Sequence, residues 1–538
     1  MKIRKEITSI SFNCLIILGF IYCYSCRSAE HDHIVAGVGI AAVKINLLGS
    51  DYASGKSSTQ VNLKEAGLLV KGNIQRQSKM ITPSLFFEAE LAPSNNNAKK
   101  SGNGSTEPTA LVTGDQIGAG MKFRIIAYRQ DDNSYQAHQD YTVGEQAQPL
   151  MLDSGKAYTI IAYSYGSTSA LPQISTGEMT NLSQAQIGYD DNNKDLMYQK
   201  IEGFTPDGNN PNNKLDIKLR HKLSQITTVI NSYIGDISEI SWATLRPHHP
   251  EGVLSLSTGI ISRTYESDER LNFSGTFPTT RATSDPVLIN ADTGGNLTGL
   301  FSANLTVNNI GTTISLPNSF KITPEYKNNL TINLMKCGAY VGPNNDRTNY
   351  KEFMCHNLGA DYSADPFTPS AAIHGAKYQW GAQTGEEGRY VSQADDQSNP
   401  GDIADWNSTP KPDGSWSDTS KTSNDPCPTG YRLPTTIQWQ AVIAYNNVER
   451  VGSWADNGNY TTALYFRNPS NIRTLMLPAA GFRYPTIGSI FERGTLGHYW
   501  SSSGTTSDVI FLSFDSSRIN VASSDISTHG FPVRCVAE

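Results

Sequence analysis

The sequence predicts a mainly β protein, with two β-domains in tandem followed by an α+β domain. Its 538 residues exceed what one hydrophobic core can organise, so several domains are expected. Glycine (45 residues), tyrosine (25) and phenylalanine (18) are abundant, whereas only 17% of the residues are charged. The clearest apolar segments are short, β-branched or aromatic, and bounded by polar turns. These three observations favour β-sandwiches joined by polar loops over helical bundles.

The N-terminus has the pattern of an export signal. Three cations within the first five residues precede an apolar run over residues 14–22, which is too short to span a bilayer. The serine directly before Cys26 resembles the cleavage site of bacterial lipoproteins, which implies a signal peptide over residues 1–25 and acylation of Cys26. Residues 26–37 would then form a tether, and the acidic patch around Glu30 resembles the surface-export tag of Bacteroidetes lipoproteins. Ordinary secretion with cleavage nearby is the alternative.

The first β-domain is expected to cover residues 38–213. Its first strand is expected over residues 38–48, where apolar side chains partly alternate with other residues. Two clearer strands follow at residues 122–129 and 157–165, because both segments are β-branched and aromatic and are followed by turn residues. A stretch dense in glycine, proline and asparagine over residues 202–213 marks the end of the domain.

The second β-domain is expected over residues 214–335. It begins with apolar residues that alternate with charged ones, and it closes with a second alternating segment. The alternating residues are Leu215, Ile217 and Leu219 at the start, and Leu330, Ile332 and Leu334 at the end. A period of two residues predicts strands that turn one face toward a core.

The third domain, residues 336–538, is organised around a Pro/Gly turn that contains Cys427. A short apolar strand follows the turn. Thr435 and Gln438 then have capping-box spacing, which predicts that a helix begins after Thr435. A terminal strand is expected over residues 530–535.

Four cysteines follow the signal region and Cys26, and all lie in the third domain: Cys337, Cys355, Cys427 and Cys535. An even set in an exported chain predicts two disulfides, for which three pairings are possible. We expect Cys337–Cys355 and Cys427–Cys535, because the second bridge would join the turn before the helix to the terminal strand. A zinc site is the alternative, although no pair has the short spacing that zinc ligands prefer.

The two β-domains resemble a known family. A lipoprotein signal, a β-domain and a strand running into His221-Lys-Leu-Ser-Gln-Ile are similar to the fimbrillin-like proteins of Bacteroidetes. The resemblance covers residues 38–335 and implies two transthyretin-like β-sandwich domains in tandem. It also implies assembly into a fimbrium, in which removal of the first strand opens a groove that a neighbour's donor strand fills.

A second resemblance covers the third domain. Six motifs stand in order and together are similar to the Fibrobacter succinogenes major paralogous domain, which is C-type-lectin-like. They are Lys351-Glu-Phe-Met-Cys-His-Asn-Leu-Gly-Ala-Asp361, His374-Gly-Ala-Lys-Tyr-Gln-Trp-Gly381, Asp425-Pro-Cys-Pro-Thr-Gly-Tyr-Arg-Leu-Pro434, Leu477-Pro-Ala-Ala-Gly-Phe482, Tyr499-Trp-Ser-Ser502 and Gly530-Phe-Pro-Val-Arg-Cys-Val536. The resemblance implies an α+β C-type-lectin-like head over residues 336–538.

The sequence gives no indication of catalysis. No metalloprotease motif, nucleophile elbow or paired catalytic set is present, so we expect no enzymatic activity. The lectin-like superfamily includes a cysteine-dependent sulfatase-activating enzyme, but the cysteines here stand where a structural bridge is expected. The formal net charge of −7 does not suggest a nucleic-acid partner.

A long polar segment, residues 385–424, carries the candidate ligand-binding residues. Exposed indole rings of Trp406 and Trp416 could stack on a sugar or enter a partner's pocket, although packing of the loop onto the domain is the favoured interpretation. Asp405 and Asn407 are the polar candidates beside Trp406. Acidic residues of the segment could bind calcium. However, C-type lectins use Trp-Asn-Asp in a ligand strand and this chain has Trp-Asn-Ser, so a solvated loop without a cofactor is favoured.

These features predict a cell-surface lipoprotein that acts as a fimbrial subunit at the tip, with a head that binds a host or microbial glycan or protein. Because Cys535 would hold the terminal strand in the head, the chain should accept a donor strand from a shaft or adaptor subunit and not give one. Arg76, in an exposed-looking polar stretch, is the expected maturation cut site, with Lys56 and Lys64 as competitors. The alternative is a static surface lipoprotein that captures glycans for nutrient uptake.

Overall fold

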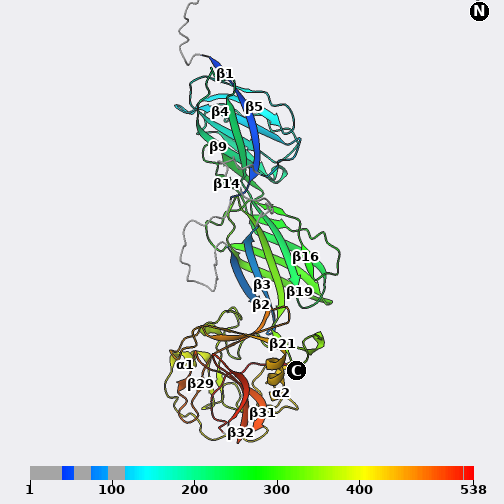
Figure 1. Cartoon of the computed structure of the whole chain (residues 1–538), viewed down its shortest axis with the longest axis vertical. Helices are drawn as coiled ribbons and strands as arrows, with labels where there is room; N and C mark the ends of the chain where they lie inside the picture. Colours follow the sequence, from blue (N-terminus) through cyan, green and yellow to red (C-terminus); the bar gives the residue numbers. More distant parts are fainter. Residues whose placement is uncertain (1–38, 54–73, 95–114, 525) are drawn as a thin grey trace, which may run out of the picture.

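The structure, a computed structural model, describes residues 39–53, 74–94, 115–524 and 526–538. Three bodies follow one another along the long axis: a first β-body, a middle β-body and the C-terminal head (Figure 1). The predicted signal peptide, Cys26 and the tether lie outside the described residues, as do Lys56 and Lys64. In the part of the chain that the structure describes, no helix is long and apolar enough to cross a membrane.

The first β-body is built on a seven-stranded sheet with the order β5-β4-β7-β9-β10-β1-β6. Its strands are β1 (Ile40–Asp51), β4 (Lys122–Arg129), β5 (Tyr135–Thr142), β6 (Leu150–Asp153), β7 (Tyr158–Ser164), β9 (Met197–Phe204) and β10 (Lys214–His221). A second sheet, β14-β13-β8, packs on one face of the first. It consists of β8 (Gln186–Asp190), β13 (Glu251–Ser255) and β14 (Ile261–Arg263), and the 3-10 helix η1 (Asp191–Asn193) follows β8.

The central strands of this sheet are buried on both faces. Ile125 and Ala127 of β4 face one core, whereas Ile126 and Tyr128 of the same strand face the other. Burial on both faces explains why the segment reads as a continuous apolar run and not as an alternation. The strand predicted at residues 157–165 is β7, in which every residue is buried.

The middle β-body is a sandwich of two sheets around one core. One sheet has the order β16-β11-β20-β3-β2, with β17 also paired to β11, and the other has the order β15-β12-β18-β19. The strands are β2 (Gln75–Met80), β3 (Leu85–Pro93), β11 (Ser224–Ser232), β12 (Ile237–His248), β15 (Ser267–Arg270), β16 (Arg281–Thr283), β17 (Val287–Ile289), β18 (Gly299–Val307), β19 (Ile310–Phe320) and β20 (Lys327–Lys336). The second predicted alternation is β20, where Leu330, Ile332 and Leu334 are fully buried.

The division between the β-bodies differs from the one expected at residue 213. Strand β10, expected to open the second domain, pairs with β1 and β9 and places Leu215, Ile217 and Leu219 in the first core. Conversely, β2 and β3 fall within the range expected for the first domain but join the middle sheet through the pairing of β3 with β20. The sequence of an alternating strand does not show to which sheet the strand belongs. The period of two residues reveals that one face is buried, but not which core buries it.

The head has short strands, and its described part contains two α-helices, α1 (Gln393–Ser398) and α2 (Thr436–Tyr445). Its strands are β21 (Gly338–Tyr340), β22 (Tyr350–Glu352), β23 (Lys377–Tyr378), β24 (Tyr390–Val391), β25 (Tyr431–Arg432), β26 (Asn447–Val451), β27 (Ala463–Arg467), β28 (Arg473–Pro478), β29 (Phe482–Arg483), β30 (Ile490–Phe491), β31 (Gly497–Thr505), β32 (Asp508–Phe514), β33 (Ile519–Ser524) and β34 (Val536–Ala537), with 3-10 helices η2 (Arg347–Asn349) and η3 (Ala371–Ile373). Three-stranded sheets form from β26-β27-β28 and from β31-β32-β33.

Helix α2 begins where the sequence predicts. The Thr435 side chain accepts a hydrogen bond from the Gln438 N–H, and the Gln438 side chain accepts one from the Thr435 N–H, so the capping box is confirmed. Trp439 and Val442 of this helix are buried in one of the two main cores of the head. The prediction of a mainly β protein is likewise confirmed, since both α-helices of the described chain are short and lie in the head.

Candidate functional site

Strand β1 occupies a slot between two other strands of the first sheet. Residues 40–43 pair antiparallel with β6, and residues 44–51 pair parallel with β10. The strand predicted over residues 38–48 is therefore present, with its start and end two or three residues later. Within the described sheet, β6 is paired with β1 and with no other strand, so β6 depends on β1 for its place.

The side chains of β1 complete the core of the first β-body. Ala41 and Val43 are buried, and Ile45 and Leu47 pack at the edge of the same core. Leucines of β6 and the alternating apolar residues of β10 belong to this core as well. Without β1, this apolar surface and two rows of backbone N–H and C=O groups would face water. Strand β1 thus completes both the sheet and the core of the first β-body.

The end of β1 contacts the junction between the two β-bodies. Nε of Arg220 donates to the Asp51 carboxylate at 2.5 Å. The ring of Tyr52 stacks on His221 with centroids 4.0 Å apart, and the Ala53 N–H donates to a carbonyl of the middle β-body at 2.8 Å. His221 opens the motif that resembles the fimbrillin-like proteins, and its position here beside the end of β1 gives that motif a structural role.

Arg76 lies in a strand and not in the exposed connection that the sequence indicated. It belongs to β2, the edge strand of the middle sheet, where it stands opposite Glu90 of β3. Its Nε donates to the Glu90 carboxylate at 2.6 Å, and about half of its side chain is exposed. A protease would have to detach β2 from β3 to cut at this residue. Arg76 is exposed, as the polar sequence indicated, because an edge strand can expose alternate side chains while its backbone stays paired.

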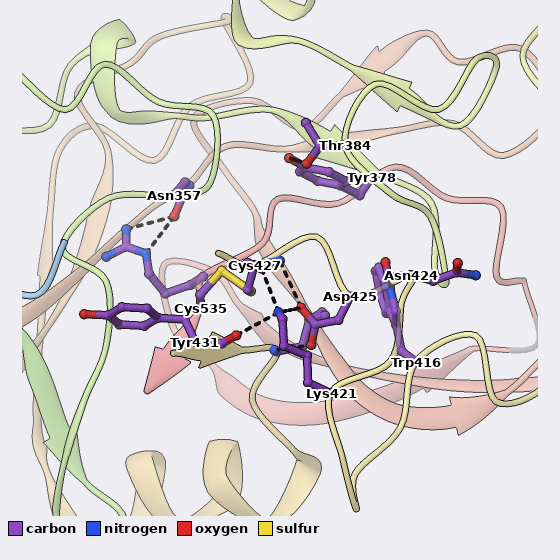
Figure 2. Close-up of a disulfide and its surroundings, with 12 residues drawn as sticks. Asn357, Tyr378, Thr384, Trp416, Lys421, Asn424, Asp425, Cys427, Tyr431 and Cys535 are labelled. Carbon is purple, nitrogen blue, oxygen red and sulfur yellow. Dashed lines mark hydrogen bonds and ion pairs between the residues drawn. A yellow bond between two sulfur atoms is a disulfide. The ribbon is translucent and has the colours of Figure 1, made fainter. Parts of the chain in front are cut away.

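The terminal strand is held inside the head (Figure 2). Cys427 and Cys535 form a disulfide with their Cα atoms 5.9 Å apart, and Cys337 forms a disulfide with Cys355, so the expected pairing is confirmed. Next to the first of these bridges, Lys421 donates to one carboxylate and two backbone carbonyls at 2.6–2.9 Å. The terminal strand lies later than the expected residues 530–535: residues 532–535 are not in a strand, and β34 begins at Val536 and pairs with β25 just beyond the bridge.

Arg534 anchors the segment that directly precedes β34. Its guanidinium donates to the Asn357 side chain and to the backbone carbonyls of Met354 and Cys355. Burial lowers the pKa of Arg534 to about 10, so the group remains charged at neutral pH. A strand donated from this end would have to break the bridge and these hydrogen bonds.

The two tryptophans predicted as ligand contacts are buried. Trp416 is 1% exposed, its Nε1 donates to the Asn424 carbonyl at 3.0 Å, and its ring packs edge-on against Trp380. Trp406 is 7% exposed. Neither indole is exposed enough to serve as the ligand contact considered from the sequence, and the favoured interpretation, packing of the loop onto the domain, is confirmed. A polar segment gives no local signal of this burial, because each indole meets its apolar neighbours from distant parts of the chain.

Asp405 and Asn407 occupy turn positions. Asp405 is exposed and has a φ of 62°, a left-handed conformation that aspartate adopts more readily than most residues. The Asn407 side chain accepts a hydrogen bond from the Thr409 N–H at 2.8 Å, and the backbone N–H of Asn407 donates to the Gly388 carbonyl at 2.8 Å. The hydrogen bonds of Asn407 thus stabilise the loop itself. Because Trp406 is buried, neither Asp405 nor Asn407 lies beside an exposed indole.

The carboxylates of the polar segment mostly contact other protein groups. Glu386 pairs with Lys411 at 2.8 Å, and Asp418 accepts hydrogen bonds from Ser502 and Ser503. Among the described residues, only one group of three His, Asp or Glu side chains brings its donor atoms within 4.8 Å of one another, and that group lies in the β-bodies. The segment does not gather the carboxylates that calcium prefers.

A buried ionic cluster, which the sequence did not reveal, centres on Asp396 in α1. Lys377, Arg483 and Arg493 approach its carboxylate at 3.3, 2.8 and 3.0 Å. Burial raises the pKa of Asp396, but the three cations outweigh this effect and hold the pKa below its ordinary value. Because Lys377 comes from β23 and the arginines come from the region of β29 and β30, one carboxylate joins three parts of the head. The four side chains are at most 8% exposed, so the cluster is not accessible to a ligand.

Comparisons with known proteins find only distant similarities. No family model and no curated protein matches the chain. Among solved structures, the chain is similar to a candidate cell adhesion protein from Bacteroides uniformis, with 17% identity and a TM-score of 0.28 over 40% of this chain and 86% of that one. It is also similar to a fimbrial assembly protein from Parabacteroides distasonis, with 10% identity and a TM-score of 0.26 over 43% of this chain and 86% of that one. Similarity at such low TM-scores establishes neither fold nor function.

Proposed function

We propose that this chain is a lipid-anchored, non-enzymatic cell-surface protein that assembles into a fimbrium as its tip subunit. The two β-bodies are transthyretin-like domains that serve assembly, and the head is a C-type-lectin-like domain that mediates adhesion to a host or microbial glycan or protein. Cys26 carries the lipid at the outer membrane before assembly. The observation that supports this proposal best is the slot of β1, the first described strand, between β6 and β10.

Assembly exchanges β1 for a strand of a shaft or adaptor subunit. Loss of β1 leaves apolar surface and two unpaired backbone edges in water, a state that a new strand relieves. Main-chain hydrogen bonds then give affinity, and the positions vacated by alternate side chains give specificity. Because Ala41 and Val43 fill the deepest positions, the incoming strand needs a small residue followed, two positions later, by a β-branched one.

The tip position follows from the head. A shaft subunit both accepts and donates a strand, whereas the strands nearest the C-terminus here are held by Cys427–Cys535, by β25 and by Arg534. The chain therefore accepts a strand and does not give one. A filament that grows from such a subunit has it at the end.

A second function, glycan capture by a static surface lipoprotein, is favoured by the contacts at the end of β1. Strand exchange would break the Asp51–Arg220 ion pair and the stacking of Tyr52 on His221. If those contacts hold β1 permanently, the groove never opens and no polymer forms. The two functions differ in whether β1 remains in the mature protein.

The test prevents cleavage between the two β-bodies in the producing bacterium. Replacing Arg76, Lys56 and Lys64 together with alanine should leave the protein anchored, monomeric and absent from sheared surface fibres. Removing one side chain is insufficient, because Arg76 is paired within β2 and the two lysines compete with it as cut sites.

A matched control replaces three exposed cations elsewhere, Lys156, Arg281 and Arg518, which should leave incorporation into fibres unchanged. If the first variant still enters fibres at the wild-type level, strand exchange at β1 is refuted and the uptake function gains support.

A further inference from the structure

A cavity of about 370 Å³ lies where the middle β-body meets the head. The turn between β2 and β3 enters the head there, and the N–H groups of Cys337 and Cys355 donate to carbonyls of this turn at 2.7 Å. Phe86 of β3 stacks on Phe367 of the head with centroids 5.0 Å apart. These contacts fix the two walls relative to each other. The volume falls within the range of about 300–1,000 Å³ found for small-molecule sites, which often lie at domain interfaces.

Both bodies contribute charged and polar side chains to the wall. The middle β-body supplies Arg76, Ser78, Glu88 and Tyr233, and the head supplies Asp365 and Arg473. Two guanidinium groups and two carboxyl groups are the charged groups of the wall, so its formal charge is zero. The two carboxylates would repel a phosphate or carboxylate ligand, and the two arginines would repel a cationic ligand. A neutral ligand that both donates and accepts hydrogen bonds can interact favourably with all four of these side chains.

The two arginines are held in place and keep spare hydrogen-bonding capacity. Arg76 pairs with Glu90 at 2.6 Å, and Arg473 pairs with Glu449 at 2.7 Å. A guanidinium carries five N–H donors, so such a pair leaves donors available to a ligand. Arg473 also lies 3.9 Å above the Tyr465 ring, which restricts its position further.

Three groups of the middle β-body lack a full set of partners. The Ser78 hydroxyl is buried and has no hydrogen-bond partner among the described residues. Glu88 forms a hydrogen bond with Asn333 but no ion pair with any residue that the structure describes, and burial raises its pKa, an effect that nearby Arg76 partly offsets. Tyr233 is 55% exposed, so its ring can take a contact. Leaving a buried hydroxyl without a partner is unfavourable, and a ligand that hydrogen-bonds to the Ser78 hydroxyl removes this cost.

We propose that this cavity binds a neutral sugar residue of a glycan. A pyranose ring offers hydroxyl groups that accept from guanidinium and donate to carboxylate, so it suits a wall that carries both without net charge. Its C–H face suits the ring of Tyr233. The site lies between two bodies, outside the polar segment where the sequence placed the ligand contacts, and binding there does not depend on assembly into fibres.

The test uses the soluble chain, residues 27–538, on an array that carries neutral, sialylated and sulfated oligosaccharides. The best neutral glycan is then titrated by calorimetry. Glu88→Gln should weaken binding about tenfold or more, since a hydrogen bond to a charged group contributes about 1.5–3 kcal/mol and each 1.4 kcal/mol is a factor of ten. Tyr233→Ala should also weaken binding, because it removes the ring that contacts the C–H face of the sugar. Glu239→Gln and Tyr265→Ala remove the same groups from exposed positions away from the cavity and should change binding less than about twofold.

Three outcomes would overturn the proposal. The chain could bind only anionic glycans, it could bind no glycan, or all four variants could bind the neutral glycan with equal affinity. If a variant does not fold, the site can still be tested by measuring the hydrogen exchange of the unmodified chain with and without the neutral glycan. The neutral glycan should protect residues 76–88 and residues 365–368 together, whereas protection confined to the head away from the cavity overturns the site. Because this test needs no fibres, its result is separate from that of the cleavage experiment.

Discussion

The two disulfides should differ in what they contribute to the stability of the head. Cys427–Cys535 closes a separation of 108 residues, whereas Cys337–Cys355 closes 18. On the chain-entropy model these loops correspond to about 5 and about 3 kcal/mol of unfolding free energy. Replacing Cys427 and Cys535 with alanine should therefore cost about 2 kcal/mol more than replacing Cys337 and Cys355. Buried packing is lost in both double variants, because all four cysteines are at most 5% exposed.

Tryptophan fluorescence isolates this effect within the full chain. Six of the seven tryptophans lie in the head, and the seventh, Trp242, lies in the middle β-body with 70% of its surface exposed. A Trp242→Phe background then makes the emission report the head alone. Urea unfolding of the wild type and of both double variants gives the three free energies. Equal losses, or a larger loss from the short loop, would refute the entropic argument.

Three further predictions concern the interior of the head. Asp396→Asn should lower its unfolding free energy by about 3–5 kcal/mol, because three buried cations lose their counter-charge. Urea unfolding beside the exposed control Asp405→Asn checks this, and equal stability would contradict a structural role for the cluster. Trp416→Ala should cost about 3–5 kcal/mol as a large-to-small core change, whereas a loss below about 1 kcal/mol would indicate a surface side chain. Burial lowers the pKa values of three histidines, to about 4 for His356, about 3 for His374 and about 4 for His498. Below pH about 6.5 the unfolded chain binds more protons than the folded one, so stability should fall between pH about 6.5 and 4. An unchanged melting temperature from pH 7 to pH 5 would contradict neutral buried histidines.

Features that depend only on a short stretch of sequence could be predicted. The capping box at Thr435 and Gln438 needs only its own spacing, and it begins α2 as expected. The alternation at Leu330, Ile332 and Leu334 identified a strand with one buried face. The disulfide pairing was also predicted, because one cysteine lies in a turn before a helix and its partner was expected near the end of the chain; Cys535 directly precedes β34.

Features set by distant contacts were not predictable. Strand β10 alternates as a middle-body strand would, yet its parallel pairing with β1 places it in the first sheet. Trp416 stands in a polar segment, and its burial depends on Trp380 and other residues far along the chain. The interdomain cavity is defined by residues from β2, β3 and the head, which no local pattern connects.

The N-terminal sequence of the protein in sheared surface fibres tests the central claim most directly, because it shows whether β1 has been removed. Mass spectrometry of the fibre-associated chain should find a start beyond Asp51, with the groove between β6 and β10 left for a partner's strand. A fibre-associated chain that starts at an acylated Cys26 and retains β1 would contradict strand exchange and would favour a static surface lipoprotein.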